Sequence, residues 1–386
     1  MTQIGIDKMG LYVPQYYLDL KDLAHARGED PDKFIIGIGQ DKMAVPSLYE
    51  DVVSLAANAG SLILSEGDRD QIDQVFVASE SAFDQSKSLA SYLVDLLDLR
   101  PHTRVVEFKQ ACYSGTAALQ LACDYVSRRP SRKVLVITSD ISRYGLASPG
   151  EVTQGAGSIA MIVSQDPGIL ALDKEAVYLS ENAYDFWRPS YLDHALVDGK
   201  FSTELYLSFF RRLFKDYQLT YPKRVSQTRS LLFHLPFTKI ASKAYRTIED
   251  LVDSDLLNEW QSFLPAATHL NRNVGNIYTG SLYMSLVSLL VYADNIKAGD
   301  HLTLFSYGSG AMGELFSGQV QKDFRKKLSQ VNQAVLDHRL QMSVKDYEES
   351  YLYQMNYLSD SFTPPSSFKG YYLKEVNHHQ RNYGYR

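Results

Sequence analysis

The sequence predicts an α/β fold in which strands and helices alternate along a duplicated chain. Short apolar runs rich in Val, Ile and Phe alternate with longer stretches of helical periodicity, a pattern typical of largely parallel sheets covered by helices. A faint internal repeat indicates two similar halves. At 386 residues the chain is long for one simple domain. We therefore expect two domains, or one large duplicated domain, with a substantial core.

The elements of the first half can be assigned in chain order. Helical patterns cover residues 50–64, 88–97 and 115–127. The apolar runs between them are short and rich in β-branched residues, which favours strands. The predicted strands are 74–78 (QVFVA), 104–108 (RVVEF), 133–138 (KVLVIT) and 158–163 (SIAMIV).

The second half continues the alternation and then becomes polar. Strands are predicted at 230–235 (SLLFHL) and 301–306 (HLTLFS), with a strongly apolar helix at 280–293. From about residue 322 the chain is polar and Tyr-rich, and FTPPSSF at 362–368 indicates an irregular loop. We expect the last ten residues, NHHQRNYGYR, to be disordered or to form an interface.

The internal repeat places four polar residues at equivalent points. In each half a strand ends at a polar residue, Glu80 or His234, and a tight turn then opens into a helix at Cys112 or Asn276. The helix starts share the pattern Tyr-Ser/Thr-Gly-Thr/Ser, and a Gly-bearing loop follows the next strand. Duplication therefore predicts that these four residues lie at strand-to-helix ends and meet in one cleft.

Charge and hydropathy exclude several classes of protein. The formal net charge is −6 and no run of Lys and Arg occurs, which argues against nucleic-acid binding. The N-terminus lacks a basic segment followed by an apolar core, so no signal peptide is expected. The longest apolar stretch, near 284–293, is too short to span a bilayer. We expect a cytoplasmic protein without membrane contacts.

The two cysteines, Cys112 and Cys123, predict neither a disulfide nor a metal site. If the chain between them is helical, they are separated by about 16 Å, which is beyond the reach of a disulfide. Two cysteines are too few for a cysteine metal site, and the nine histidines show no ligand spacing. We therefore expect no bound metal.

Cys112 is the strongest candidate for chemistry. It lies between a predicted strand and a helix start rich in Gly and Ala, where backbone N–H groups and the helix dipole are expected to lower the pKa of the thiol toward neutrality. The alternative is a buried free cysteine that acts as a small hydrophobe. Cys123, in mid-helix among Leu and Ala residues, fits that alternative better.

Glu80 and His234 are weaker candidates when each is considered alone. A carboxyl group at the end of an apolar strand can line a cleft, where its raised pKa suits proton transfer. It can equally be an ordinary solvent-facing strand end. His234 interrupts a run suited to a buried strand. Taken by itself, this residue fits a core histidine that bonds to the backbone.

Lys239 and Lys243 are a candidate anion site. If a helix begins after Pro236, they are four residues apart on one face and could hold a phosphate-bearing ligand. A solvated helix face is the alternative. The Gly-rich loops at 154–157 and 307–310 could present backbone N–H groups, but neither matches a nucleotide-binding fingerprint.

Taken together, these segments resemble the hydroxymethylglutaryl-CoA synthase family. The resemblance runs from about residue 4 to 316, and the compact length is similar to the bacterial branch. One small departure is Ser114, where Gly or Ala is common in the family. The segments that carry the resemblance are IGIDKMGLYVP, QACYSGTAALQLA (110–122), ASPGEVTQGAGSIAM (147–161), YDFWRPSY with LVDGKFS (184–202), HLPFTKIASKA (234–244), NVGNIYTGSLYMSL (273–286) and LFSYGSGAMGELF (304–316).

The resemblance implies a duplicated thiolase-like α/β fold. In this superfamily two similar halves pack as five αβαβα layers around two mixed, largely parallel sheets. Residues 1–166 would form the half with Glu80 and Cys112, and residues 167–386 the half with His234 and Asn276. The family further implies a homodimer that uses no cofactor, because its CoA thioesters are substrates.

The implied reaction condenses acetyl-CoA with acetoacetyl-CoA to 3-hydroxy-3-methylglutaryl-CoA and free CoA, in the mevalonate pathway of isoprenoid biosynthesis. The catalytic set would be Cys112 as acetyl-carrying nucleophile, Glu80 as general acid/base and His234 polarising the second substrate. The substrate-binding positions implied are Asn276 as an orienting residue, the backbone at Ser309 facing the thioester oxygen, Asp30, Tyr144, Thr153 and Ser202 near the acyl or pantetheine groups, and Lys239 and Lys243 on CoA.

Two other functions remain open at this stage. A type III ketoacyl synthase shares the fold and a Cys-His-Asn set, but it forms its carbanion by decarboxylation and needs no base such as Glu80. A non-catalytic thiolase-fold CoA-binding protein would lack a reason to keep Cys112, Glu80 and His234 together. Labelling by acetyl-CoA would separate them, because a scaffold acquires no covalent acetyl group.

Overall fold

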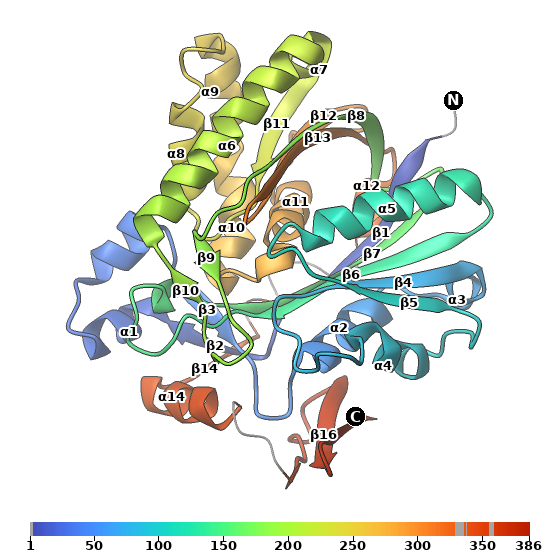
Figure 1. The fold of residues 1–386 in the computed structure, drawn as a ribbon, viewed down its shortest axis with the longest axis vertical. Coiled ribbons are helices and arrows are strands. Elements are labelled where there is room, and N and C mark those ends of the chain that lie inside the picture. The colour runs from blue at the N-terminus through green and yellow to red at the C-terminus, as the bar shows by residue number, and fades with distance from the viewer. Residues whose placement is uncertain (1–2, 329–335, 337, 355–358) are drawn as a thin grey trace.

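The computed structural model describes residues 3–328, 336, 338–354 and 359–386, and a bent nine-stranded sheet forms its centre (Figure 1). All six predicted strands are confirmed as members of this sheet. The strand order is β11-β12-β13-β8-β1-β7-β6-β4-β5. The bounds are β1 Ile4–Tyr12, β4 Ile72–Ala78, β5 Arg104–Phe108, β6 Lys133–Ile141, β7 Ala156–Gln165, β8 Leu170–Ser180, β11 Thr228–Phe233, β12 His301–Gly308 and β13 Met312–Val320.

The sheet is mixed, as predicted, but the expectation that it is largely parallel is wrong. The pairs β4–β5, β4–β6 and β11–β12 are parallel, whereas β1, β7, β8 and β13 pair with their neighbours in antiparallel fashion. Short connections contribute to this difference. Only residues 309–311 join β12 to β13, too few for the crossover that a parallel pair requires.

The two expected sheets are continuous through a narrow seam between β1 and β8. Only two residue pairs form it, Gly5 with Ala171 and Ile6 with Leu170. A Cβ atom at Gly5 would lie 2.1 Å from the carbonyl oxygen of Leu170, so only glycine fits here. The strands β1, β7, β6, β4 and β5 lie on one side of the seam, and β8, β13, β12 and β11 lie on the other.

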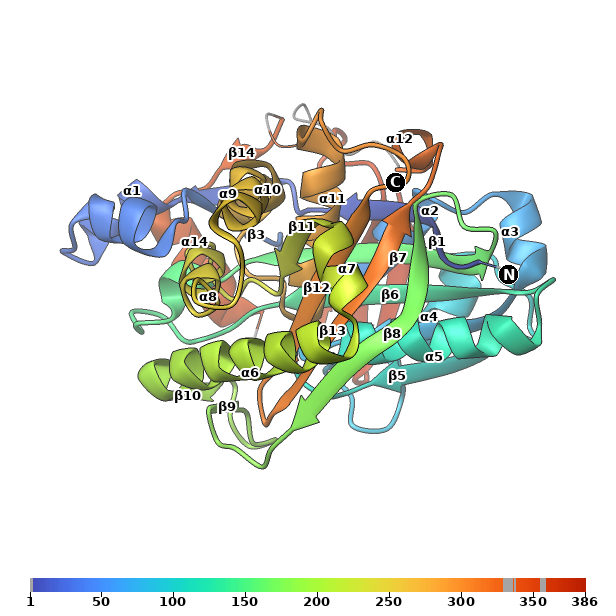
Figure 2. The ribbon, with the colours of Figure 1, turned by 90° about the horizontal axis from the view of Figure 1, so that it is seen from above.

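Helices cover both parts of the sheet and fill the space between them, which confirms the five-layer arrangement (Figures 1 and 2). Each helical layer packs in its own apolar cluster against the strands it faces. The outer layer on β4, β6 and β7 contains α2 (Val52–Ser61) and α4 (Leu89–Leu96). The central layer contains α5 (Ser114–Arg128), α10 (Leu264–Val274) and α11 (Ser281–Tyr292). The other outer layer contains α6 (Gly199–Thr220), α8 (Ile240–Arg246) and α9 (Ser254–Ser262).

The two repeated helix starts meet in the central layer. Gly115, in the first turn of α5, approaches η3 (Tyr278–Gly280), which leads into α11. A Cβ atom at Gly115 would lie 2.7 Å from the carbonyl oxygen of Thr279. This close approach brings the turns after β5 and before α11 to the same place at the ends of the strands.

The remaining elements lie around this core. A small sheet packs near α1, and a short hairpin precedes α6. None of the helices in the described ranges is both long and apolar enough to cross a membrane. These elements are α1 Leu20–Ala26, η1 Lys33–Ile38, α3 Glu66–Gln71, η2 Glu151–Thr153, α7 Pro222–Gln227, α12 Phe324–Lys327, α14 Val344–Tyr353, β2 Tyr16–Asp19, β3 Lys42–Val45, β9 Phe186–Trp187, β10 Leu196–Val197, β14 Leu340–Gln341 and β15 Asp360–Ser361.

Of the two expectations for the last ten residues, disorder is wrong, and an interface stays a prediction. Strands β16 (Tyr371–Asn377) and β17 (Gln380–Tyr385) form a hairpin next to α2. The side chain of Asn58 donates to the carbonyl of Tyr371 at 2.9 Å and accepts from its N–H at 2.7 Å. Arg381 pairs with Asp51, the N-cap of α2, at 2.7 Å. These bonds hold a polar, Tyr-rich segment in place despite its low hydrophobicity.

Candidate active site

Cys112 lies on a tight turn between β5 and α5. Ala111 just before it has φ of +45°, a left-handed conformation that L residues rarely adopt. Tyr113 just after it is the N-cap of α5. The end of β12 closes on this turn, since a Cβ atom at Gly308 would lie 2.5 Å from the backbone nitrogen of Tyr113. Backbone packing from the neighbouring strand therefore fixes the position of the thiol.

The Cys112 thiol donates a hydrogen bond of 2.8 Å to Oε1 of Glu80, which follows β4. Burial, with the nearby charge of Asp140, raises the pKa of Glu80 to about 8. Burial and the Glu80 carboxylate raise the pKa of the Cys112 thiol well above its usual value. The expectation that the helix start lowers this pKa is wrong, because the adjacent carboxylate and desolvation outweigh the helix dipole.

Asp140, at the end of β6, binds the backbone of Glu80. It is fully buried; its Oδ1 accepts from the backbone N–H of Glu80 at 2.8 Å, and its Oδ2 accepts from the hydroxyl of Thr279 at 2.5 Å. Burial raises the pKa of Asp140 to about 6. Arg188 donates to the carbonyl of Glu80 at 2.6 Å, and its charge lowers the pKa of Glu80. The backbone of Glu80 is thus fixed at both its N–H and its carbonyl group, which positions the carboxyl group of this residue.

His234 follows β11 and is 3% exposed. Its backbone N–H donates to the carbonyl of Phe305 at 2.9 Å, and its backbone carbonyl accepts from the hydroxyl of Tyr206 at 2.7 Å. Burial lowers the pKa of the imidazole to about 3. The ring is therefore neutral at physiological pH and carries one N–H donor and one acceptor nitrogen.

Asn276, on the turn before α11, is fixed by several bonds. Its Oδ1 accepts from the N–H of Tyr278 at 2.9 Å and from the hydroxyl of Ser281 at 2.7 Å, while its Nδ2 donates to the hydroxyl of Tyr144 at 3.0 Å. Its backbone N–H donates to the carbonyl of Thr153 at 2.9 Å. The amide is thus held in one orientation against Tyr144.

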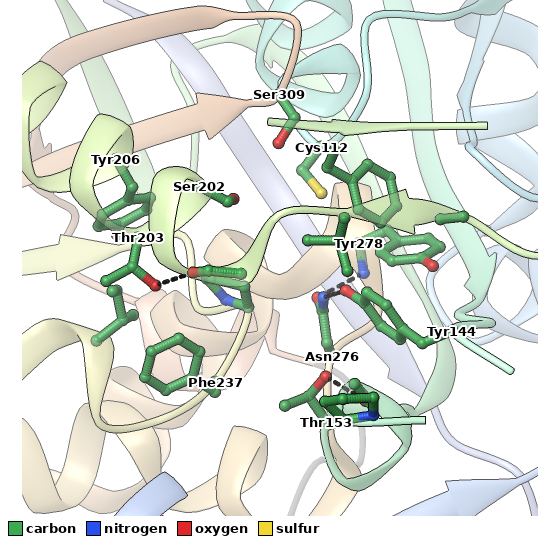
Figure 3. Close-up of a pocket in the computed structure, with 18 of the residues that line it drawn as sticks. Cys112, Tyr144, Thr153, Ser202, Thr203, Tyr206, Phe237, Asn276, Tyr278 and Ser309 are labelled. Carbon is green, nitrogen blue, oxygen red and sulfur yellow. Dashed lines mark hydrogen bonds between the residues drawn. The ribbon is translucent and has the colours of Figure 1, made fainter. Parts of the chain in front are cut away.

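A cavity of about 430 Å³ brings most of the candidate residues together. In Figure 3 the sulfur of Cys112 and the hydroxyl of Ser309 point into the same space, with Asn276 and Tyr144 across from them. Much of the remaining wall is aromatic or aliphatic, as expected for a site that binds an acyl chain. The predicted residues that line the cavity are Cys112, Tyr144, Thr153, Ser202, His234, Asn276 and Ser309.

Four predicted residues lie outside that lining. Glu80 is one of them and reaches the cavity only through its hydrogen bond to Cys112. Asp30 is exposed between α1 and η1, where its Oδ1 accepts from the N–H of Asp32 at 3.0 Å. Lys239, the N-cap of α8, borders a second cavity of about 400 Å³. Lys243, one turn further on, places its ammonium 5.2 Å from the ring of Phe237, which belongs to the wall of the main cavity. Both lysines are exposed.

The sequence analysis missed two buried carboxylates of this region, Asp140 and Asp185. Asp140 follows an apolar strand run just as Glu80 does, and this parallel was the available signal. Asp185 accepts from the hydroxyl of Tyr307 at 2.9 Å and from the N–H of Gly310 at 2.9 Å, so it orders the loop that bears Ser309. Its signal was its position inside the motif YDFWRPSY. Within the described residues no cluster of metal-ligating side chains occurs.

Comparison with known proteins agrees with this geometry. The family model for the hydroxymethylglutaryl-coenzyme A synthase N-terminal region matches residues 1–167, and the C-terminal model matches 170–262 and 255–386. The chain belongs to the hydroxymethylglutaryl-CoA synthase family. A member of that family from Enterococcus faecalis is 43% identical over 347 residues, which cover 89% of this chain and 90% of the relative.

Solved structures of hydroxymethylglutaryl-CoA synthases superpose over the whole chain. A crystal structure of an HMG-CoA synthase complexed with CoA has a TM-score of 0.95 at 41% identity, with 100% of both chains covered. The structure of MvaS in complex with 3-hydroxy-3-methylglutaryl coenzyme A has a TM-score of 0.88 at 32% identity and covers 100% of this chain and 99% of that one. These matches extend the family assignment from the sequence to the arrangement of all five layers.

Proposed function

We propose that this member of the hydroxymethylglutaryl-CoA synthase family condenses acetyl-CoA with acetoacetyl-CoA, through an acetyl group on Cys112, and so supplies the mevalonate pathway of isoprenoid biosynthesis. The observation that carries the proposal is the 2.8 Å hydrogen bond between Cys112 and Glu80 at the wall of an acyl-sized cavity. CoA thioesters are the substrates in this proposal, and no separate cofactor takes part.

In the first step the Cys112 sulfur attacks the carbonyl carbon of acetyl-CoA. Glu80 accepts the thiol proton, since the two groups are already in hydrogen-bond contact. The tetrahedral intermediate collapses, the bond to the CoA sulfur breaks, and that sulfur leaves with the proton. Backbone N–H groups at Cys112 and Ser309 are the proposed donors to the oxyanion.

In the second step Glu80, as carboxylate, removes a proton from the methyl group of acetyl-Cys112. The resulting enolate attacks the ketone carbon of acetoacetyl-CoA, and a carbon–carbon bond forms. His234, kept neutral by burial, donates a hydrogen bond to the ketone oxygen, and Glu80 returns its proton to the alkoxide. Asn276 and Tyr144, which are held together at 3.0 Å, orient the bound acyl groups.

Water completes the reaction by hydrolysing the Cys112 thioester. The former acetyl group leaves as the free carboxylate of 3-hydroxy-3-methylglutaryl-CoA, and Cys112 regains its proton. One acetyl-CoA, one acetoacetyl-CoA and one water are consumed, and the second CoA remains on the product. The apolar wall of the cavity delays water until the condensation is complete.

Mass spectrometry of the intact protein tests the proposal. Incubation with acetyl-CoA should add one acetyl group, and subsequent addition of acetoacetyl-CoA should remove it as 3-hydroxy-3-methylglutaryl-CoA appears. Cys112→Ser should abolish the adduct. Cys123→Ser is the matched control and should keep it, because Cys123 does not line the main cavity and has no Glu80 beside it. Acetyl found on Cys123 would contradict the assignment.

The same series separates the two other functions considered. A type III ketoacyl synthase would require a malonyl donor for carbon–carbon bond formation and would not respond to loss of Glu80. A CoA-binding scaffold would acquire no acetyl group at all. The contact between Glu80 and Cys112 favours the synthase that uses acetyl directly.

We also propose that two copies associate and that the enzyme works in the cytoplasm. Among the described residues, strand β5 ends the sheet with one edge unpaired, and its Val106 is 44% exposed. This is the kind of edge that a second copy can cover. Sedimentation velocity at micromolar concentration should give the mass of a dimer. A single species with the monomer mass would contradict this.

A further inference from the structure

Glu314 is a buried carboxylate with no role in the chemistry proposed above. It lies on β13 and is 4% exposed, and burial raises its pKa. Its Oε2 accepts a hydrogen bond of 2.6 Å from the hydroxyl of Tyr113, and its Oε1 accepts one of 2.7 Å from Nε2 of Gln120. Burial of a carboxyl group costs free energy unless such hydrogen bonds satisfy it, which points to a specific role for Glu314.

Both partners of Glu314 belong to the segment that carries the nucleophile. Tyr113 directly follows Cys112 and is the N-cap of α5, and Gln120 lies about two turns further along that helix. One carboxyl group therefore holds the beginning of α5 at two points. The Tyr113 side chain makes no capping hydrogen bond to α5, and its hydroxyl binds Glu314 instead.

The strand next to Glu314 holds the same helix. Ser306 on β12 is the direct cross-strand neighbour of Glu314, and its Oγ accepts a hydrogen bond of 2.7 Å from the hydroxyl of Thr116. Beyond Ser306, β12 reaches Gly308, whose backbone packs against the Cys112 turn, and then Ser309. Strands β12 and β13 thus hold the nucleophile segment, and the loop that joins them contains Ser309.

We propose that Glu314 is a positioning residue: by holding Tyr113 and Gln120, it fixes the turn that carries Cys112 relative to the backbone at Ser309. The inference rests on the proposed function, because the geometry it preserves is that of sulfur attack with the oxyanion facing Ser309. Displacement of an attacking atom by about 1 Å can lower a rate roughly 100-fold. Loss of the hydrogen bonds from Glu314 to Tyr113 and Gln120 should therefore slow the attack by Cys112.

Three variants test the role. Glu314→Leu keeps much of the bulk but removes both acceptors, and it should lower kcat for acetyl transfer roughly 10- to 100-fold with KM nearly constant. Glu314→Gln keeps an acceptor for Tyr113 and should restore kcat to within about threefold of wild type. Glu107→Gln is the control, since this half-buried carboxyl on β5 bonds the N–H of Leu89, away from the cavity. Wild-type kcat in Glu314→Leu would overturn the proposal.

A second measurement does not depend on the proposed function. Alkylation by iodoacetamide, followed by peptide mass spectrometry, reports Cys112 and Cys123 separately. Glu314→Leu should speed alkylation of Cys112 about threefold or more and leave Cys123, on the same helix, unchanged. Equal acceleration of both would mean that the whole helix has loosened, which overturns a positioning role. If wild type takes no acetyl group from acetyl-CoA, the proposed function fails, while the alkylation ratio still decides the role of Glu314.

The path through Tyr113 can be tested by a double-mutant cycle. If Glu314 acts through that hydroxyl, Tyr113→Phe added to Glu314→Leu should cost less than about twofold beyond the single change. Losses in kcat that multiply would show that the two residues act independently and would overturn the proposed path.

Discussion

Glu80 and Cys112 hold one proton between them. The thiol donates it in the free enzyme. Burial raises the pKa of both groups, and the nearby Glu80 carboxylate raises that of the thiol further, whereas the hydrogen bond from the thiol lowers the pKa of Glu80. In the reactive form Glu80 is ionised, so the pair carries one negative charge, and the proton moves from sulfur to carboxylate when a substrate carbonyl arrives. Acetylation of Cys112 then removes the hydrogen bond that lowers the pKa of Glu80, so the carboxyl becomes a stronger base when it is needed as one.

The pH dependence of condensation follows from this. Acetyl-enzyme formed in advance should react with acetoacetyl-CoA at a rate that rises with pH to a limb at or slightly above 8, because the ionised form of Glu80 is the base. Rapid-quench measurements between about pH 6 and 9.5 give this limb. Asp140→Asn removes a charge that raises the pKa of Glu80 and should shift the limb to lower pH. A limb near the ordinary carboxyl value would contradict Glu80 as the base.

Glu80→Gln should stabilise the fold at alkaline pH while it abolishes condensation. A carboxyl whose pKa is higher in the folded protein contributes stability that is complete below its unfolded pKa and is lost as pH rises through about 8. The amide avoids that loss. Tm should therefore rise by about 2–4 °C at pH 8.5 and change little near pH 4.5. A gain of equal size at both pH values would show that the cause is packing and not ionisation.

Lys239 and Lys243 should contribute to binding of CoA esters without affecting turnover. Replacing both with Ala should raise KM about 5- to 30-fold, reduce its dependence on salt and leave kcat unchanged. We expect Lys243 to account for most of the effect, because its ammonium lies against the cavity wall residue Phe237. Lys345→Ala on α14, which pairs with Glu349, is the control. Unchanged KM would mean that both lysines only cover a solvated helix face.

For single residues, the sequence identified the side chains of the catalytic set but not their charge states. Cys112, Glu80 and His234 stand out because each is polar at the end of an apolar run. The raised pKa of the thiol could not be predicted, because it depends on Glu80 and Asp140, each separated from Cys112 by roughly 30 residues, and on burial by the whole fold.

Among the elements, the end of β12 packs closely against the turn at Cys112. Gly308→Ala should destabilise the protein by about 1–3 kcal/mol and slow acetylation, because the new Cβ atom would meet backbone atoms of Tyr113 and Gln110 that cannot move independently. Urea unfolding and acetylation rates measure the two effects. Gly67→Ala in α3, where a Cβ atom meets nothing within 4 Å, should be neutral or slightly stabilising. Equal behaviour of the two variants would contradict the tight contact.

The predicted elements were those with a strong local period, and all ten of them are present. Strands β1, β8 and β13 were missed because glycines and charged residues interrupt their apolar pattern. Gly5 in β1 and Gly318 in β13 occur where neighbouring strands come too close for a Cβ atom. That requirement belongs to the assembled sheet, and a short window of sequence contains no sign of it.

Across the whole molecule, the C-terminal hairpin is joined to the first helix of the core. Asn58→Ala should cost about 1–3 kcal/mol in the free energy of unfolding, because both backbone groups of Tyr371 lose their partner. Activity at saturating substrate should persist, since neither residue lines the main cavity. Asn382→Ala, whose amide makes an exposed bond to Glu375, should change stability by less than about 0.5 kcal/mol. Loss of activity without loss of stability in Asn58→Ala would contradict this interpretation.

The wall of the main cavity is made from segments spread between Cys112 and Ser309 in the chain. During synthesis at roughly 5–20 residues per second, Cys112 emerges about 10–40 seconds before the loop that bears Ser309. Until then the cavity wall around the thiol is incomplete, because Tyr307 and Ser309 belong to it. The nascent chain therefore carries an ordinary cysteine, open to oxidants but unable to consume acetyl-CoA, and its reactivity toward thioesters arises only after β12 and the loop that follows it have been synthesised.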